Sequence, residues 1–318
     1  MKRHNNLYQQ ICSIENLQMA DAIAQMGKQR RFDVIRHKKK ADDNIEKLHH
    51  MLVNKTYQVS PYTIFVVKEH KERTVYRLPY FPDMIIQQAI MNVIEPLLVS
   101  MFTADTYACI KGRGVHKASN AISKALGDVA STQYCLQLDV NKFYPSVNHD
   151  VLKQQLRRKF KDNDFLWLMD TIIDSAPGLP IGNFLSQSLS TFYLTGFDHW
   201  IKEQKRVKHY FRYVDDIIVL GSDKSRLHEL RKEIAAYLQE TVKLQIKGNW
   251  RVFPVDKCFI DAFGYKHYRK HRLLRKRIKQ AFARAVAKGK GMATLASYKG
   301  WAKHCKSKHL LKKLLPHE

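Results

Sequence analysis

The segment FRYVDDIIVL, with two adjacent carboxylates, constrains the fold of this chain more than any other stretch. Asp215 and Asp216 follow the apolar pair Tyr210 and Phe211 and precede the branched run 217–220. Aromatic and β-branched runs around a short polar break predict a β-hairpin with both acids at its tip. An ordinary solvated turn has the same pattern. A rigid tip with two carboxylates is also suited to a divalent metal ion, because hard ions such as Mg²⁺ prefer oxygen ligands.

A third carboxylate lies far upstream, in the segment LQLDVNKFYPS. Residues 135–138 predict a strand that leads into Asp139, and Pro145 should end the extended segment. One such acid is usually a turn cap, but a sheet that joined this strand to the hairpin would gather three carboxylates. These would repel one another without cations. Two metal ions about 4 Å apart are the usual arrangement for in-line phosphoryl displacement, so the pattern indicates nucleotidyl transfer or its hydrolytic relative.

Between these acids lies GLPIGNFLSQ, residues 178–187. Gly178, Pro180 and Gly182 allow a sharp turn and a close approach to a ligand before a helix that should begin near Leu185. An ordinary loop before a helix has the same composition. Taken in order, however, the three segments resemble the palm of reverse transcriptases, with its first catalytic Asp, its Leu-Pro-x-Gly loop and its Tyr-x-Asp-Asp hairpin.

The resemblance extends over nearly the whole chain. Segments 77–98 and 106–118 are similar to the fingers, 263–277 to the primer-gripping turn and 297–304 to a short thumb. The implied fold class is α+β, a right-hand polymerase of fingers, palm and thumb with an antiparallel palm sheet and a short basic helical thumb. The implied domains are an N-terminal basic helical region at 1–60, fingers at 61–133, palm at 134–265 and thumb at 266–318.

The chain departs from the reverse transcriptase pattern at two places, and the first departure narrows the family. Most reverse transcriptases carry Gln-Gly-x-x-x-Ser-Pro in the loop, whereas this chain has Ile181-Gly182 followed by Ser186-Gln187. This change is typical of the reverse transcriptases of diversity-generating retroelements, whose N-terminal stretch and compact length are also similar. The relatives usually have Arg where this chain has Ile110. Lys111 or Arg113 are therefore candidate replacements for one triphosphate-binding cation.

The resemblance implies an RNA-templated DNA polymerase with two Mg²⁺ ions, in which the primer 3′-hydroxyl attacks the α-phosphate of a dNTP. Asp139 and Asp215 would be the primary metal ligands, with Asp216 and the Val140 carbonyl as further ones. The implied role is to copy a template-repeat RNA with frequent errors at adenine, with a small basic accessory protein as partner. Two alternatives stay open. One is an antiphage-defence reverse transcriptase that makes non-templated or protein-primed DNA, and the other is a non-catalytic RNA-binding protein of polymerase fold.

Further site residues are implied by the same resemblance. Tyr144 stands where an aromatic side chain lies under the incoming sugar, with Phe143 next in line and a plain core aromatic as the alternative. Ile181 and Gln187 are the candidates for low fidelity, because Ile has neither donor nor acceptor where other enzymes have Gln. Candidate nucleotide-binding residues are Lys68, Lys71, Arg73, Arg77 and Gly182. Candidate nucleic-acid contacts are Lys111, Arg113, Tyr268, Arg275, Lys276, Arg277 and Trp301.

The charge of the chain agrees with a polyanionic partner. The formal net charge is +26, and beyond residue 265 the only acid is Glu318. Tyr268, Phe282, Tyr298 and Trp301 are interleaved with these cations, which allows base stacking as well as phosphate contact. A solvated helix face explains any single Lys, but counterion release on nucleic acid explains so large an excess better. No amphipathic stretch supports a membrane surface as the partner.

Cysteine spacing and hydropathy predict the compartment. Five cysteines stand apart without a Cys-x-x-Cys pair, which argues against structural zinc and a disulfide scaffold. We expect no signal peptide and no apolar segment of 18 residues, and hence a protein of the reducing cytoplasm. Periodicity predicts helices at 84–98, at 149–160 and after Ser222 or Asp223, and basic helices near the C-terminus interrupted at 288–291. Strands at 134–139, 209–213 and 217–220 should form the antiparallel sheet.

Overall fold

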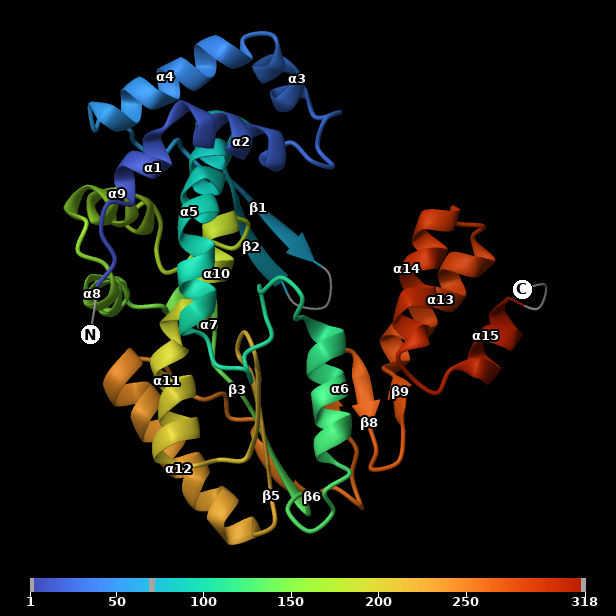
Figure 1. The fold of residues 1–318 in the computed structure, drawn as a ribbon. Coiled ribbons are helices and arrows are strands. Elements are labelled where there is room, and N and C mark those ends of the chain that lie inside the picture. The colour runs from blue at the N-terminus through green and yellow to red at the C-terminus, as the bar shows by residue number, and fades with distance from the viewer. Residues whose placement is uncertain (1–2, 69–71, 316–318) are drawn as a thin grey trace. The chain divides into compact units, whose positions relative to one another are not determined.

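The computed structural model describes residues 3–68 and 72–315 (Figure 1). It divides into two compact units, each built from separate stretches of the chain. The first unit comprises Met1–Phe102, Lys142–Gly196 and Thr241–Leu244, and the second comprises Thr103–Asn141, Phe197–Glu240 and Gln245–Glu318. The four domain ranges expected from the sequence stay a prediction.

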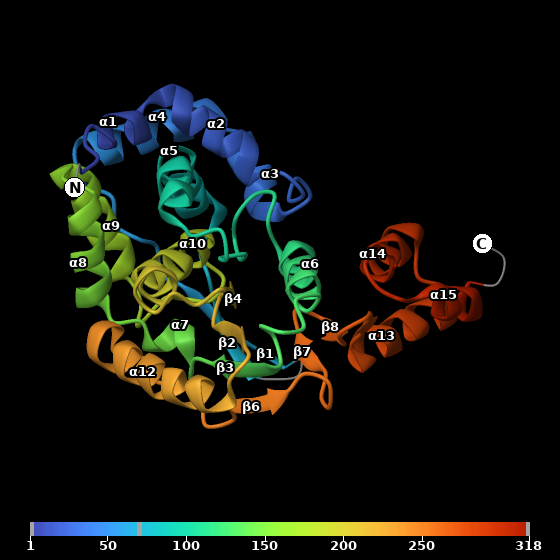
Figure 2. The same ribbon diagram turned by 60° about the horizontal axis from the view of Figure 1, so that its bottom comes forward.

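The first unit is mainly helical and forms around one long apolar helix, α5. Its helices are α1 (Tyr8–Cys12), α2 (Ile14–Ala24), α3 (Phe32–Lys38), α4 (Ala41–Val53), a π-helical segment (Tyr80–Met84), α5 (Ile85–Met101), α7 (Phe143–Ser146), α8 (His149–Lys159), α9 (Asn163–Ile173) and α10 (Phe184–Tyr193). Helices α1, α2 and α10 pack against α5, and α2 also contacts α4 (Figures 1 and 2). The predicted helices at 84–98 and 149–160 correspond to α5 and α8, and both belong to this unit.

The segment Tyr80–Met101 corrects one expectation. Its length and its mean hydropathy of 1.4 are those of a helix able to cross a membrane, although no such apolar segment was expected. In this structure Ile86, Ile90 and Ile94 on α5 are fully buried. Core helices of soluble proteins pass the same length and hydropathy test.

A two-stranded hairpin also belongs to the first unit. Strand β1 (Thr63–Lys68) pairs antiparallel with β2 (Glu72–Arg77). Ile64, Phe65 and Val66 of β1 are exposed. The amide of Tyr76 in β2 donates to the carbonyl of Ile181 at 2.8 Å, so the hairpin is tied to the loop at 178–183.

The second unit contains two antiparallel sheets and the C-terminal helices. Its elements are α6 (Val115–Ala125), β3 (Tyr134–Asp139), a π-helical segment (Trp200–Gln204), β4 (His209–Tyr213), β5 (Asp216–Gly221), α12 (Lys224–Val242), β6 (Arg251–Pro254), β7 (Ile260–Ala262), β8 (Tyr265–His267), β9 (Arg272–Leu274), α13 (Lys276–Ala287), α14 (Met292–Lys303) and α15 (Lys308–Leu314). Helix α11 (Thr195–His199) begins in the first unit and ends in the second. The predicted antiparallel sheet is confirmed as β4-β5-β3-β6, in which β6 is a further strand that the sequence did not indicate.

Side chains on the two faces of the four-stranded sheet enter different cores. Cys135, Phe211 and Ile218 pack with apolar residues of α6 on one face. Tyr210, one position before Phe211 and therefore on the opposite face, contacts the ring of Phe197, which contacts Tyr237 of α12. This alternation follows the two-residue period of a strand, and it buries both faces.

Local sequence signals explain how the neighbouring elements begin. The carboxylate of Asp223 accepts the amides of Ser225 at 2.7 Å and of Arg226 at 3.3 Å, so it caps α12 as predicted. Strand β3 ends at Asp139, whereas Pro145 lies inside the short helix α7. The expectation that Pro145 ends the strand was therefore wrong, because Pro is well tolerated in a first helical turn.

Candidate active site

The two acids of the hairpin occupy different backbone positions. Tyr213 of β4 pairs with Asp216 of β5, which leaves Val214 and Asp215 as a two-residue turn. Asp216 is thus the first residue of β5. The sequence had placed both acids at the tip of the hairpin, and for Asp216 this prediction was wrong. Val214 has φ +57°, and a β-branched residue in this left-handed region costs about 1–3 kcal/mol. The turn that presents Asp215 is therefore strained.

The register of the sheet brings Asp139 to these acids. Asp139, the last residue of β3, is the direct cross-strand partner of Asp216. The amide of Val140 donates to the carbonyl of Asp215 at 3.3 Å, which ties the end of β3 to the turn. Like charges directly opposite each other in an antiparallel pair are destabilising. The three carboxylates therefore converge at one edge of the sheet, as the sequence predicted, at a cost in stability.

This repulsion appears in the ionisation of Asp215. Burial raises the pKa of Asp215 to about 7, and the carboxylates of Asp139 and Asp216 act in the same direction. Oδ1 of Asp139 is buried without a hydrogen-bond partner. A hydrogen bond between Asp139 and Asp215 can form only when one of them is protonated. When both carry a charge, no hydrogen bond joins them and they repel each other.

Lys247 is a neighbour of Asp139 that the sequence did not reveal. Its Nζ lies 3.0 Å from Oδ2 of Asp139, and its amide donates to the Asp139 carbonyl at 2.8 Å. The side chain of Lys247 is 34% exposed and that of Asp139 is 24% exposed. Lys247 thus places a positive charge beside one of the three converging carboxylates.

The donor set fits a hard divalent cation. Within 3–68 and 72–315, no three His, Cys, Asp or Glu side chains are already arranged as a metal-binding group. The unpartnered Oδ1 of Asp139 and the raised pKa of Asp215 nevertheless mark carboxylate oxygens that lack positive charge. Carboxylate and carbonyl oxygens are the ligands that Mg²⁺ and Mn²⁺ prefer. Asp139, Asp215 and Asp216, with the carbonyl of Val140, would hold such an ion.

Tyr144 and the glycine-rich loop lie together in the first unit. The amide of Leu179 donates to the Tyr144 carbonyl at 2.8 Å. At Gly178, whose φ is +61°, a Cβ would lie 2.5 Å from that same oxygen, so the loop requires glycine there. The hydroxyl of Tyr144, on a half-buried side chain, lies 3.4 Å from Oγ of Ser190. Phe143 is only 3% exposed, so burial removes it as the second candidate for a sugar contact.

The other end of this loop lies against the β1–β2 hairpin. At Gly182, with φ +115°, a Cβ would lie 2.6 Å from the Tyr76 carbonyl, so only glycine allows this approach. Ile181 is half-buried and Gln187 is exposed near the start of α10.

The candidate nucleotide-binding cations differ in their surroundings. Lys68 and Arg73 are exposed on the hairpin. Arg77 is also exposed, and its Nη2 lies 3.6 Å from the Asp33 carboxylate. Lys71 lies outside the described residues. Because Lys68 and Arg73 are both exposed, a triphosphate could reach either side chain, and exposure does not show which of the two would bind it.

Two candidate contacts near Ile110 are now distinguishable. The guanidinium of Arg113 donates to the carbonyl of Thr103 at 2.6 Å and to that of Thr106 at 2.8 Å. Lys111 is exposed. Since the bonds of Arg113 hold its own segment together, Lys111 is the better candidate for the missing cation.

The predicted nucleic-acid contacts in the C-terminal region divide in the same way. Arg275 is bonded to the Asp261 carboxylate and donates to its carbonyl at 3.0 Å. The Trp301 ring packs on Tyr265, with 5.4 Å between ring centroids. Tyr268 stacks on His271 at 4.7 Å. Lys276 and Arg277, in the first turn of α13, are exposed. These two are the most accessible of the group.

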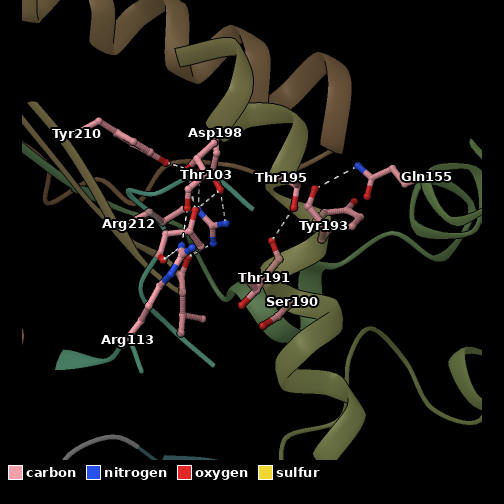
Figure 3. A network of polar contacts seen from close by, with 12 residues as sticks. Thr103, Arg113, Gln155, Ser190, Thr191, Tyr193, Thr195, Asp198, Tyr210 and Arg212 are labelled. Carbon is pink, nitrogen blue, oxygen red and sulfur yellow. Dashed lines mark hydrogen bonds and ion pairs between the residues drawn. The ribbon is translucent and has the colours of Figure 1, made fainter. Parts of the chain in front are cut away.

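A buried polar network includes Arg212 of β4, the strand that leads to Asp215 (Figure 3). Arg212 and Asp198 are both fully buried and form an ion pair with N–O distances of 2.5 Å and 2.7 Å. The only sequence signal for this pair is a charged residue inside the apolar strand that leads to Asp215. A charge at a buried strand position needs a partner.

Comparisons with known proteins agree with this fold. Residues 66–249 match the family described as reverse transcriptase (RNA-dependent DNA polymerase). Protein YkfC of Escherichia coli is 23% identical, over 70% of this chain and 69% of its own. The group II intron-encoded protein LtrA of Lactococcus lactis is 21% identical over 52% of this chain and 29% of its own.

Solved structures show the same fold at low identity. Telomerase from Candida tropicalis, in complex with a fragment of telomeric RNA, has a TM-score of 0.53 and 10% identity, covering 84% of this chain and 58% of its own. The Candida albicans telomerase complex has a TM-score of 0.52 and 10% identity, covering 85% of this chain and 61% of its own. The α+β polymerase fold expected from the sequence is confirmed. Because the matched segment spans more than half of the 318 residues and includes the loop and the hairpin, this chain belongs to the reverse transcriptase family, the RNA-dependent DNA polymerases.

Proposed function

We propose that the chain catalyses Mg²⁺-dependent DNA synthesis on an RNA template at Asp139, Asp215 and Asp216. The observation that carries this proposal is the register of β3, β4 and β5, which gathers three acids from distant segments at one sheet edge. Reverse transcriptases generally use divalent metal ions. When bound, such ions lower the pKa of the primer hydroxyl and stabilise the charge that develops on the phosphates.

The chain's own residues define the other parts of the reaction. The three carboxylates orient the cations, and Lys247 supplies positive charge next to Asp139. Tyr144 is the proposed side chain beneath the sugar, where its ring would clash with a ribose 2′-hydroxyl. Lys68 and Arg73 on the hairpin and Lys111 near Ile110 are the proposed triphosphate contacts, because all three are exposed.

The finer role is that of a reverse transcriptase of a diversity-generating retroelement. It would copy a template-repeat RNA into cDNA mutated at adenine, in a reducing cytoplasm and with a small basic accessory protein. The support is Ile181-Gly182 followed by Ser186-Gln187 in the glycine-rich loop. The carbonyl of Ile181 is fixed to β2 while its side chain is only half-buried, which leaves an apolar surface where a Gln would offer hydrogen bonds.

The chemistry of Ile181 limits fidelity. Shape contacts without hydrogen bonds discriminate between similar ligands by only about 1–3 kcal/mol, or roughly 10- to 200-fold. Gln187, in place of the usual Pro, retains an amide donor and a free φ. An enzyme that positions the incoming nucleotide by packing alone would therefore often incorporate the wrong nucleotide.

One experiment tests both levels of the proposal. Wild type, Ile181→Gln and Ile181→Leu each copy one defined RNA, and the cDNA is sequenced. We expect Ile181→Gln to lower errors opposite template adenine more than errors at other bases, while the apolar control Ile181→Leu keeps them. If wild type and Ile181→Gln are both active and make equal numbers of errors opposite adenine, Ile181 does not set the fidelity of the enzyme.

Activity itself is checked with Asp215→Asn, which should remove most primer extension while keeping the fold. Near-normal extension by Asp215→Asn would overturn the catalytic assignment. DNA made without added template would instead favour the antiphage-defence alternative.

A further inference from the structure

The turn that presents Asp215 needs external support. Val214 has φ +57°, a conformation that a β-branched side chain rarely adopts. Strained backbone of this kind persists only where surrounding contacts hold it in place. The amide of Val140 reaches the Asp215 carbonyl at 3.3 Å, which is a long hydrogen bond. A stronger contact must therefore fix the turn.

Arg212 supplies that contact. Its Nη1 donates to the carbonyl of Val214 at 3.0 Å. The same guanidinium donates through Nε to Oδ1 of Asp198 at 2.7 Å and through Nη2 to Oδ2 at 2.5 Å. Two parallel bonds to one carboxylate fix the plane of the guanidinium, so its third nitrogen has only one direction in which to donate.

Asp198 is itself held by two further side chains (Figure 3). The hydroxyl of Tyr210 donates to Oδ1 at 2.6 Å, and the hydroxyl of Thr106 donates to Oδ2 at 2.8 Å. Burial alone would lower the pKa of Arg212, but the Asp198 carboxylate outweighs it and raises that pKa above its usual value. Arg212 therefore keeps its charge, and the hydrogen bonds to Asp198 make the pair rigid.

The backbone of Arg212 is anchored as well. Its amide donates to the carbonyl of Asp105 at 3.0 Å, and its carbonyl accepts the amide of Tyr107 at 3.1 Å. Arg113 holds this neighbouring segment through the carbonyls of Thr103 and Thr106. Arg212 is thus fixed at both its main chain and its side chain, which makes it a rigid reference for the turn.

We propose that Arg212, oriented by Asp198, is a positioning residue that fixes the Val214 carbonyl and thereby aims the Asp215 carboxylate. A buried ion pair is weak support for stability, because desolvation cancels much of its attraction. The presence of the pair is better explained by geometry, because Arg212 donates to Asp198 through two nitrogens and to the Val214 carbonyl through the third. The inference rests on the proposed function, since it assumes that Asp215 acts in catalysis.

The test is Arg212→Lys, which keeps a positive charge for Asp198 but lacks the planar fork that also reaches Val214. We expect kcat for single-nucleotide addition to fall on the order of 10- to 100-fold, because small misplacements of a reacting group cost about that much. The KM for dNTP and the Kd for primer–template should stay within about twofold. The divalent-ion concentration for half-maximal rate should rise, which lost stability alone would not cause.

The matched control is Tyr210→Phe. It removes one bond to the same carboxylate and leaves the contact with Val214 intact. Its kcat and metal dependence should match those of wild type. In the Arg212→Lys background, Val214→Gly should restore part of kcat, because glycine adopts positive φ without strain.

A second variant provides the test if Arg212→Lys does not fold. Arg212→Gln with Asp198→Asn removes both buried charges together, which proteins tolerate better than removing one. It also removes the guanidinium, so the same loss of kcat is expected. Wild-type kcat and metal dependence in whichever variant folds would overturn the inference. If Asp215→Asn is inactive in the same assay, the proposed function survives that outcome, whereas an active Asp215→Asn overturns both.

Discussion

Replacing Asp215 by asparagine should stabilise the metal-free protein while it abolishes polymerase activity. Burial and the neighbouring carboxylates raise the pKa of Asp215 from 3.8 to about 7. At about 1.4 kcal/mol per pKa unit, ionising this group costs the folded chain about 4 kcal/mol. Asparagine has nearly the same shape and no charge. We therefore expect Asp215→Asn to raise the free energy of unfolding by up to about 4 kcal/mol at about pH 8 without metal.

The pH dependence of this gain has a definite sign. Because the pKa is higher in the folded chain than in the unfolded chain, the folded chain binds this proton more tightly. The penalty on Asp215 is absent below its unfolded pKa of 3.8 and complete above its folded pKa of about 7. The stability of wild type should fall relative to Asp215→Asn across this window as the pH rises.

The assay is urea denaturation in EDTA at about pH 5 and about pH 8, followed by tryptophan fluorescence. Asp216→Asn is the control, and it should gain less because Asp216 is exposed. Added Mg²⁺ should stabilise wild type and leave Asp215→Asn nearly unchanged, since a ligand stabilises only the state that binds it. If Asp215→Asn is no more stable than wild type at pH 8 in EDTA, the carboxylates do not repel one another as argued.

Two further predictions concern substrate choice and binding. Tyr144→Ala should raise ribonucleotide relative to deoxyribonucleotide incorporation on one template, and an unchanged ratio would exclude Tyr144 as the sugar contact. Lys276→Gln with Arg277→Gln should flatten the salt dependence of primer–template binding, because each lost phosphate contact removes nearly one unit from the log–log slope. Titration of a labelled duplex at several salt concentrations measures this slope, and an unchanged slope would mean that these two exposed cations contact no phosphate. Removing everything after Lys288 is a poorer test, because it would strip Trp301 from Tyr265.

The strands that carry the acids were predictable because their signals are local. Residues 134–139 and 217–220 are rich in branched and aromatic side chains, which fit a sheet, and Asp223 is a strong helix cap. Strands β7, β8 and β9 have three residues each, too few to show a two-residue period. The sequence therefore predicted only a turn at 263–277.

The roles of Lys247 and Arg212 could not be derived from the sequence, for a different reason. Lys247 is one of 55 Lys and Arg residues, and only the pairing of its backbone with Asp139 gives it a role. The position of Arg212 inside an apolar strand was a usable sign of a buried partner. The identity of that partner, Asp198, depended on tertiary structure. Contacts between distant segments thus set the roles of both residues.

The same electrostatics link metal binding to nucleic-acid binding. A net charge of +26 attracts polyanions to the chain as a whole. Where β3 ends and β5 begins, however, three acids converge, and their carboxylates would repel a phosphate that approaches Asp215. If the proposed function holds, divalent ions would have to neutralise these acids before a primer end or a triphosphate could bind there. The metal would then serve substrate positioning as well as the chemical step, whereas the exposed cations of α13 are expected to bind phosphate without metal.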